Sequence, residues 1–151
     1  MFRSKTLIIA VGLLLFLAGG GGALYWMFSD KVRIQGIIES AEEAVEREDL
    51  DGLMVYLSPR YQDAYGFNKL LIRRVMQDTF REFDRFEMTA GGAVIAVEGE
   101  NARVRIPVEL RVDWAGQRAY LVGTNAKPAP MEIALRKEGL RWRVVWVDGV
   151  K

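Results

Sequence analysis

The side chains that could do chemistry in this sequence are carboxylates, tyrosines and lysines, because the chain contains no histidine and no cysteine. The commonest general base is therefore missing, and so are thiolate nucleophiles, disulfides and thiolate metal sites. The spacing that calcium loops require is also absent. We expect no metal ion and no cofactor, and the composition favours a binding domain over an enzyme.

Aromatic residues are the candidates for lining a ligand pocket, since a small apolar ligand can pack on their rings while tyrosine hydroxyls orient it. The alternative is that they pack in the core, which is the commoner role of aromatic residues at alternating strand positions. The candidates are Tyr61, Tyr65, Trp114, Tyr120, Trp142 and Trp146.

The longest regular pattern runs from Ala102 to Trp114, where apolar residues alternate with charged residues or proline. Side chains alternate across a β-strand, so this segment predicts a strand with one apolar face and one ionic face. No helical phase would gather its apolar residues on one side. Pro107 lies in the polar phase and has no N–H, which predicts a bulge, a bend or an unpaired edge there.

The ionic face of this strand is a candidate interface. The mixture of arginine and glutamate side chains on this face suggests one of two roles. It is either a surface that pairs with a second copy of the chain or a mixed, solvated surface. The formal net charge of +1 provides no long-range field for nucleic acid, so we expect no nucleic-acid partner. The interface candidates are Arg103, Arg105, Glu109 and Arg111.

Helices are predicted before this strand and further strands around it. Apolar residues at helical spacing predict an amphipathic helix over residues 34–45, a short helix near residues 50–57 and a third over residues 68–83. Alternation and glycine-containing turns over residues 85–146 predict an antiparallel meander of four or five strands. The fold class is therefore α+β, with three helices packed on one face of an antiparallel sheet.

The N-terminal part has the composition of a membrane segment. Residues 1–6 form a short basic tail, and residues 7–28 carry no charge. At about 1.5 Å per residue, a helix of that length would span a hydrocarbon core of roughly 30 Å. We expect a transmembrane signal anchor over residues 7–28 and a soluble domain over residues 29–151. The alternative is a signal peptide that is cleaved near Gly21-Gly22-Ala23.

The flanking charges decide the expected orientation only by a small margin, because Arg3 and Lys5 precede the segment while Lys31 and Arg33 come after it. A short basic start before a first apolar segment usually directs export of the domain on its C-terminal side. We therefore expect a single-pass protein of the bacterial inner membrane, with its C-terminal domain in the periplasm.

Two segments resemble the nuclear-transport-factor-2-like superfamily of cystatin-like cone folds. They are Glu-Asp-Leu-Asp-Gly-Leu-Met-Val-Tyr-Leu-Ser-Pro-Arg-Tyr at residues 48–61 and Met-Glu-Ile-Ala-Leu-Arg-Lys-Glu-Gly-Leu-Arg-Trp-Arg-Val-Val-Trp-Val-Asp-Gly at residues 131–149. The resemblance covers about residues 33–149 and implies a strongly bent sheet that wraps the helices into a cone with a pocket inside. Catalytic members use Asp or His with Tyr in that pocket, and no motif here places Asp63, Asp113 or Asp148 in such a role.

With its expected anchor, the chain is similar to membrane-attached bacterial members of this superfamily. We therefore favour a tethered, non-catalytic binding or scaffold domain of the cell envelope that contacts another envelope protein. The alternative is a small-molecule binder, or an enzyme of the isomerase or dehydratase kind, that uses the pocket of the cone.

Overall fold

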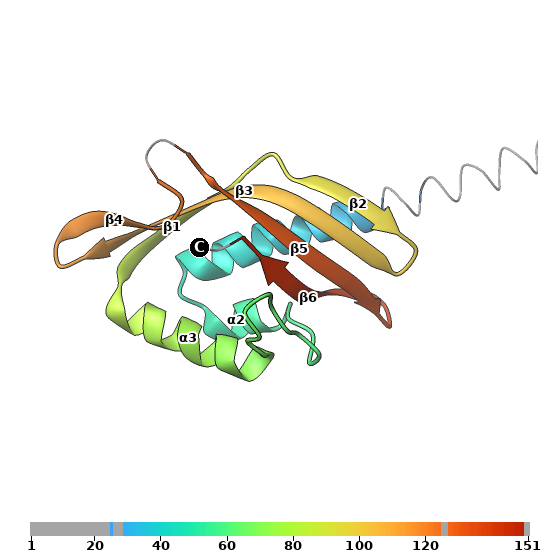
Figure 1. Ribbon diagram of the computed structural model, residues 1–151, viewed down its shortest axis with the longest axis horizontal. Helices are drawn as coiled ribbons and strands as arrows, with labels where there is room; N and C mark the ends of the chain where they lie inside the picture. The colour runs from blue at the N-terminus through green and yellow to red at the C-terminus, as the bar shows by residue number, and fades with distance from the viewer. Residues whose placement is uncertain (1–24, 26–28, 125–126, 150–151) are drawn as a thin grey trace, which may run out of the picture.

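The computed structural model describes residues 25, 29–124 and 127–149 of the chain. A helix occupies residues 29–46 and is followed by α2 (Leu50–Met54) and α3 (Lys69–Glu82). The strands then form one antiparallel sheet, and they are β1 (Asp84–Ala90), β2 (Val94–Glu98), β3 (Asn101–Trp114), β4 (Gln117–Val122), β5 (Ala129–Glu138) and β6 (Arg141–Asp148) (Figure 1). The predicted α+β class is confirmed.

The sheet is built around β3, which has neighbours on both edges along its length. On one edge, β2 pairs with the first half of β3 and β1 with the second half. On the other edge, β5 pairs with the first half and β4 with the second half, and β6 adds to β5. Within the described residues the sheet therefore has six strands, where four or five were predicted. The difference arises because β3 is long enough for two short strands to share each of its edges.

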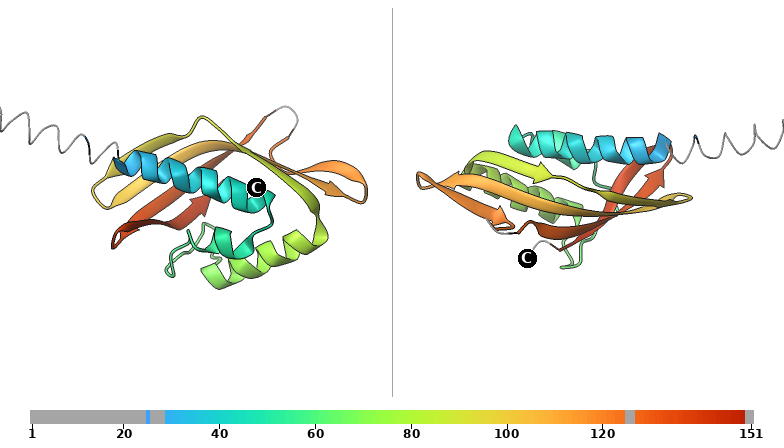
Figure 2. Two further views of the ribbon diagram at one scale, coloured as in Figure 1. Left: turned by 180° about the vertical axis from the view of Figure 1, so that it is seen from behind. Right: turned by 90° about the horizontal axis from the view of Figure 1, so that it is seen from above.

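The predicted alternation of β3 is present in the structure. Ala102, Val104, Ile106 and Val108 are all buried, while the residues between them are exposed. The buried side chains face the helix at residues 29–46, which lies across this side of the sheet (Figure 2). The core therefore lies between that helix and the apolar face of β3.

Pro107 lies at the point where one edge of β3 changes partner. On one side it is opposite Pro130 of β5. On the other side it falls between Arg105, which pairs with Val94 of β2, and Val108, which pairs with Ala90 of β1. The edge is unpaired at this position, so a residue that cannot donate a backbone hydrogen bond is tolerated there.

Side chains cap the N-terminal ends of α2 and α3. The Asp49 side chain accepts a hydrogen bond from the Gly52 amide at 2.9 Å, and the Asn68 side chain accepts one from the Leu71 amide at 2.9 Å. Each cap satisfies a backbone N–H that has no partner within its helix. No residue of α3 is fully buried, so this helix covers the end of the cone and not its centre.

The segment after α2 covers the free edge of β6. The Ser58 amide donates to the Val144 carbonyl at 2.8 Å, and the Val144 amide donates to the Tyr56 carbonyl at 2.8 Å. Further along, the Gln62 amide donates to the Val145 carbonyl at 3.1 Å. These bonds give an irregular segment a fixed position at the mouth of the cone.

The helix at residues 29–46 is fastened to the sheet at its start by a buried carboxylate. Asp30 is 8% exposed, accepts a hydrogen bond from the Trp142 indole nitrogen at 3.0 Å and pairs with the Lys137 ammonium at 3.3 Å. Near the other end, the Glu46 carboxylate accepts a hydrogen bond from the Met88 amide at 3.3 Å. The helix is thus tied to β5 and β6 at one end and to β1 at the other.

The predicted basic tail (residues 1–6) and membrane anchor (residues 7–28) lie outside the described residues, apart from Tyr25. In the described part of the chain, no helix has the length and apolar character needed to cross a bilayer. The anchor therefore stays a prediction.

We predict that Asp30→Ala lowers the free energy of unfolding by about 2 kcal/mol, because it leaves the Trp142 N–H and the Lys137 ammonium without their buried acceptor. The control is Glu43→Ala on the same helix, which removes an exposed carboxylate that pairs with Arg47 at 2.6 Å and is expected to cost less than about 1 kcal/mol. Urea unfolding followed by tryptophan fluorescence measures both. Equal losses for the two variants would contradict the anchoring role of Asp30.

Candidate functional site

The space between the helix at residues 29–46, α2 and the buried face of the sheet contains a cavity of about 160 Å³. We call it the inner cavity. Its walls come from the helix through Ile37 and Ala41, from β3 through Val104 and Ile106, and from several further aliphatic residues of α2, β1, β5 and β6. The cone therefore retains a hollow at its centre.

The chemistry of the inner cavity is almost entirely apolar. Every described lining residue except Tyr56 is alanine, valine, leucine, isoleucine or methionine. Among the described residues, the lining includes no carboxylate, lysine or arginine, and Tyr56 is the one lining residue with a polar side chain. A proton transfer inside this cavity would depend on the single phenol of Tyr56. The lining is suited to holding an apolar group by burial.

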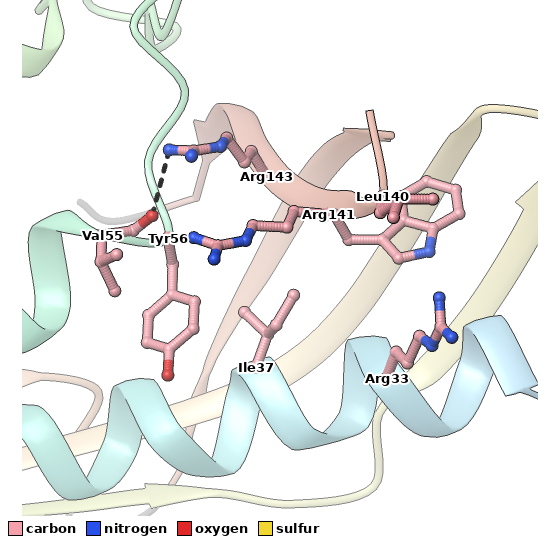
Figure 3. A pocket seen from close by; sticks show the side chains of 8 residues that line it. Arg33, Ile37, Val55, Tyr56, Leu140, Arg141 and Arg143 are labelled. Atoms are coloured by element: carbon pink, nitrogen blue, oxygen red, sulfur yellow. Dashed lines mark hydrogen bonds between the residues drawn. The ribbon is translucent and has the colours of Figure 1, made fainter. Parts of the chain in front are cut away.

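A second hollow of about 400 Å³ opens at the surface beside the inner cavity (Figure 3). We call it the vestibule. It combines apolar walls with three arginines, and no carboxylate of the described part of the chain belongs to its lining. The lining residues are Arg33, Ile37, Val55, Tyr56, Leu140, Arg141, Trp142 and Arg143.

Three parts of the chain position the vestibule. Arg33 and Ile37 are one helical turn apart, so they lie on the same face of the helix at residues 29–46 (Figure 3). The β5–β6 turn supplies Leu140, β6 supplies the arginines at positions 141 and 143, and the segment after α2 supplies Tyr56. Ile37 and Tyr56 also line the inner cavity. These two side chains are therefore the boundary between the two hollows.

The vestibule has an excess of positive charge. Arg143 pairs with Glu138 at 3.6 Å and donates to the Val55 carbonyl at 3.3 Å, a bond drawn in Figure 3. Among the described residues, Arg33 and Arg141 have no ion-pair partner. Three guanidinium groups thus surround this opening. Two carboxylates lie close to it: Glu138 pairs with Arg143, and Asp30, which accepts from the Trp142 indole, pairs with Lys137.

The structure does not bring the six aromatic candidates together. Trp142 lines the vestibule, whereas Tyr61 packs with Met54 and Leu57 in a separate core cluster beneath α2. The other four belong to neither hollow: Tyr65 is 50% exposed, Trp114 is 55% exposed, and Tyr120 and Trp146 are half-buried in β4 and β6. Tyr56, the aromatic residue that does line the inner cavity, was not among the candidates.

A bulge in β6 determines the face of the sheet on which the Trp146 side chain lies. Ala134 pairs with Trp146 but Leu135 pairs with Val144, so Val145 is an extra residue in β6. Val144 and Val147 both line the inner cavity. Since side chains alternate on either side of the bulge, Trp146 points away from the cavity. No feature of the sequence marks Val145 as the bulged position.

The outer sheet face is covered by ion pairs within the chain. The Arg103 guanidinium lies 2.5 Å from the Glu132 carboxylate, and Arg111 pairs with Glu87 at 3.0 Å. The hydrogen bonds that Arg118 donates, first to Asp113 and then to Glu87, raise the pKa of Arg118 above its ordinary value. The remaining interface candidates also lie on β3: Arg105 lies 3.9 Å from Glu132, and Glu109 is half-buried. The predicted pairing of this face with a second copy stays a prediction.

The aspartates considered for catalysis have structural partners. Asp63 accepts hydrogen bonds from the Tyr65 and Phe67 amides at 2.8 Å each. Asp113 pairs with Arg118 at 2.9 Å, and Asp148 accepts from the Gly149 amide at 2.7 Å. None of the three lines the inner cavity.

One glutamate near the core, Glu42, has a pKa above its ordinary value. Burial, followed by the charge of Glu46, raises the pKa of Glu42, while a hydrogen bond from the Ala90 backbone opposes the shift. Glu42 does not belong to the lining of the inner cavity. Over the described ranges, no group of three or more acidic side chains is arranged to hold a metal ion.

Comparison with known proteins identifies the architecture. A protein of cystatin-like fold from Novosphingobium aromaticivorans superposes with a TM-score of 0.70 at 19% identity, over 83% of this chain and 84% of that one. A protein from Streptomyces avermitilis, provisionally named a dehydratase, gives a TM-score of 0.66 at 12% identity, over 80% of this chain and 94% of that one.

The fold is that of the nuclear-transport-factor-2-like proteins. The resemblance inferred from the sequence is confirmed at this level, and identities this low show the fold alone. Bd1075 of Bdellovibrio bacteriovorus also matches, with a TM-score of 0.64 at 12% identity over 77% of this chain, which spans only 39% of that chain. No family model matches the sequence, and no curated protein matches it.

Tyr61 generates a prediction about alkaline stability. The side chain is 5% exposed, and burial, followed by the charge of Asp63, raises the pKa of its phenol well above its ordinary value. Below about pH 10 both the folded and the unfolded chain keep this proton, and above it the unfolded chain loses the proton first. The contribution of Tyr61 is therefore fully present below that pH and is lost as the pH rises toward the pKa of the folded state.

We predict that Tyr61→Phe reduces the loss of unfolding free energy between about pH 8 and about pH 11, by up to roughly 1 kcal/mol. The control is Tyr65→Phe, which removes a hydroxyl from an exposed side chain in the same connecting segment. Urea unfolding at the two pH values measures the difference. An unchanged pH dependence in Tyr61→Phe would contradict the prediction.

Proposed function

We propose that this domain binds a small apolar molecule in the inner cavity and does not transform it. The observation that supports the proposal is the lining of the cavity, which is aliphatic apart from Tyr56. Such a lining gains free energy by removing apolar surface from water, at roughly 25 cal/mol per Å². It offers no carboxylate to abstract a proton.

The volume of the inner cavity supports a ligand of modest size. An engineered apolar cavity of about 150 Å³ in another protein stays dry and binds benzene. The inner cavity, at about 160 Å³, is similar in volume and composition. We therefore propose a ligand whose buried part is about as large as one aromatic ring.

An enzymatic role of the dehydratase kind is the alternative, and its support is the provisional name of the Streptomyces avermitilis protein. Against it stands the cavity lining, in which one tyrosine would have to act as both acid and base. The binding role therefore agrees better with the residues of this chain.

We also propose that the domain is tethered to the bacterial inner membrane and faces the periplasm. The support is the uncharged segment over residues 7–28, which ends directly before the first described helix at residue 29. A partner protein in the envelope and a homodimer through the sheet face stay predictions alongside it.

We predict that Ala41→Leu abolishes ligand binding, because the larger side chain fills the inner cavity. With toluene at several times its dissociation constant, the unchanged chain should gain about 1 kcal/mol of stability, or roughly 4 °C in melting temperature. The variant should melt at the original temperature or above it and should not respond to toluene. Calorimetry measures both quantities.

The matched control for this experiment is Ala96→Leu. It makes the same change at an exposed position of β2, outside the cavity lining, so it should retain the response to toluene. A chain that shows no response to toluene before any substitution would contradict the proposed function.

The tether generates a separate prediction. The full chain should remain in the membrane pellet after alkaline carbonate extraction from bacteria, whereas a chain lacking residues 1–28 should appear in the soluble fraction. Intact mass measurement distinguishes the anchor from a cleaved signal peptide. A soluble product whose sequence begins near Ala23 would establish cleavage and contradict the tether.

A further inference from the structure

We propose that the ligand is an amphipathic anion, whose charged head lies among the vestibule arginines while its apolar tail enters the inner cavity. This inference rests on the proposed function, because it assumes that the cavity takes an apolar group. It adds the chemical class of the ligand and assigns Arg33 and Arg141 to a head-group site.

The first argument is the charge of the vestibule. Arg33, Arg141 and Arg143 line it from two elements, and its lining contains no carboxylate. Glu138 partly compensates Arg143, whose side chain is 25% exposed. Like charges that line one opening repel one another, and an anion bound in it would relieve that repulsion.

The second argument is the geometry of guanidinium groups. Arginine presents a planar set of donors that matches a carboxylate or a phosphate through paired hydrogen bonds. Arg141 and Arg143 extend from β6 toward Val55 and Tyr56, and Arg33 rises from the helix on the other side of the opening (Figure 3). Since Arg143 already donates to the Val55 carbonyl, Arg33 and Arg141 are the arginines with uncommitted donors.

The third argument is the continuity of the two hollows. Ile37 and Tyr56 line both the vestibule and the inner cavity. A molecule with its head in the vestibule therefore has a purely apolar space directly behind these two side chains. A neutral apolar ligand would use only the inner space, whereas an amphipathic anion would use both.

The test compares two ligands that share a tail, phenylpropionate and phenylpropanol. Their affinities for the full chain, held in phosphatidylcholine nanodiscs, are measured by titration calorimetry against empty nanodiscs. We expect the acid to bind about tenfold more tightly than the alcohol, as an arginine–carboxylate contact at a partly exposed site would give. In the double variant Arg33→Gln, Arg141→Gln this preference should disappear, with the affinity for the alcohol unchanged.

The control is the double variant Arg74→Gln, Arg81→Gln on α3, which removes the same number of charges outside the vestibule. It should retain the preference for the acid. Equal affinities for acid and alcohol in the unchanged chain, or a preference that survives loss of Arg33 and Arg141, would overturn the inference and leave the proposed function standing. If neither ligand binds, the proposed function fails and the inference fails with it.

The same head and tail chemistry occurs in free carboxylic acids and in anionic membrane lipids. Repeating the titration in phosphatidylglycerol nanodiscs distinguishes these sources. A weaker apparent affinity for phenylpropionate in phosphatidylglycerol than in phosphatidylcholine, with the difference absent from the double variant Arg33→Gln, Arg141→Gln, would identify the lipid as a competitor for the vestibule. An unchanged affinity would identify a free acid as the ligand.

Discussion

The structure depends on the strict alternation of β3. Because every second side chain is apolar, one face of this strand is committed to the core along most of its length. Slipping the pairing of β3 by one residue would turn its arginines inward, and burying an unpaired charge costs far more than any turn could offset. The register of all four neighbouring strands is therefore fixed by one segment, and the apolar wall of the inner cavity is fixed with it.

Local patterns were predictable from the sequence, and long-range ones were not. The alternation of β3 and the caps at Asp49 and Asn68 are determined within a few residues, so they follow from side-chain type and spacing. The face of Trp146 depends on the bulge at Val145, which only the pairing of β5 with β6 establishes. Tyr56 lies in an irregular segment that is positioned by hydrogen bonds to β6, and no periodicity marks such a segment.

The inner cavity has a simple origin in where the large side chains are placed. Phe86 packs against Phe80 with ring centroids 5.0 Å apart, and Trp114 lies 6.5 Å from Phe83, so these rings belong to the end of the cone near β1 and α3. The middle of the cone is lined by aliphatic side chains and Tyr56. Since branched aliphatic side chains reach less far than rings, the space between the helix and the bent sheet is not completely filled.

The anchoring of Asp30 connects this hollow to the vestibule. The carboxylate holds the start of the helix against Trp142 and Lys137, and one turn later the same helix presents Arg33 to the vestibule. The two sides of the opening therefore cannot separate without breaking a buried, charge-assisted contact. A head group held between Arg33 and Arg141 would span the same two elements that Asp30 already joins. Because Asp30 already holds these two elements together, binding of the head group would cost little conformational entropy.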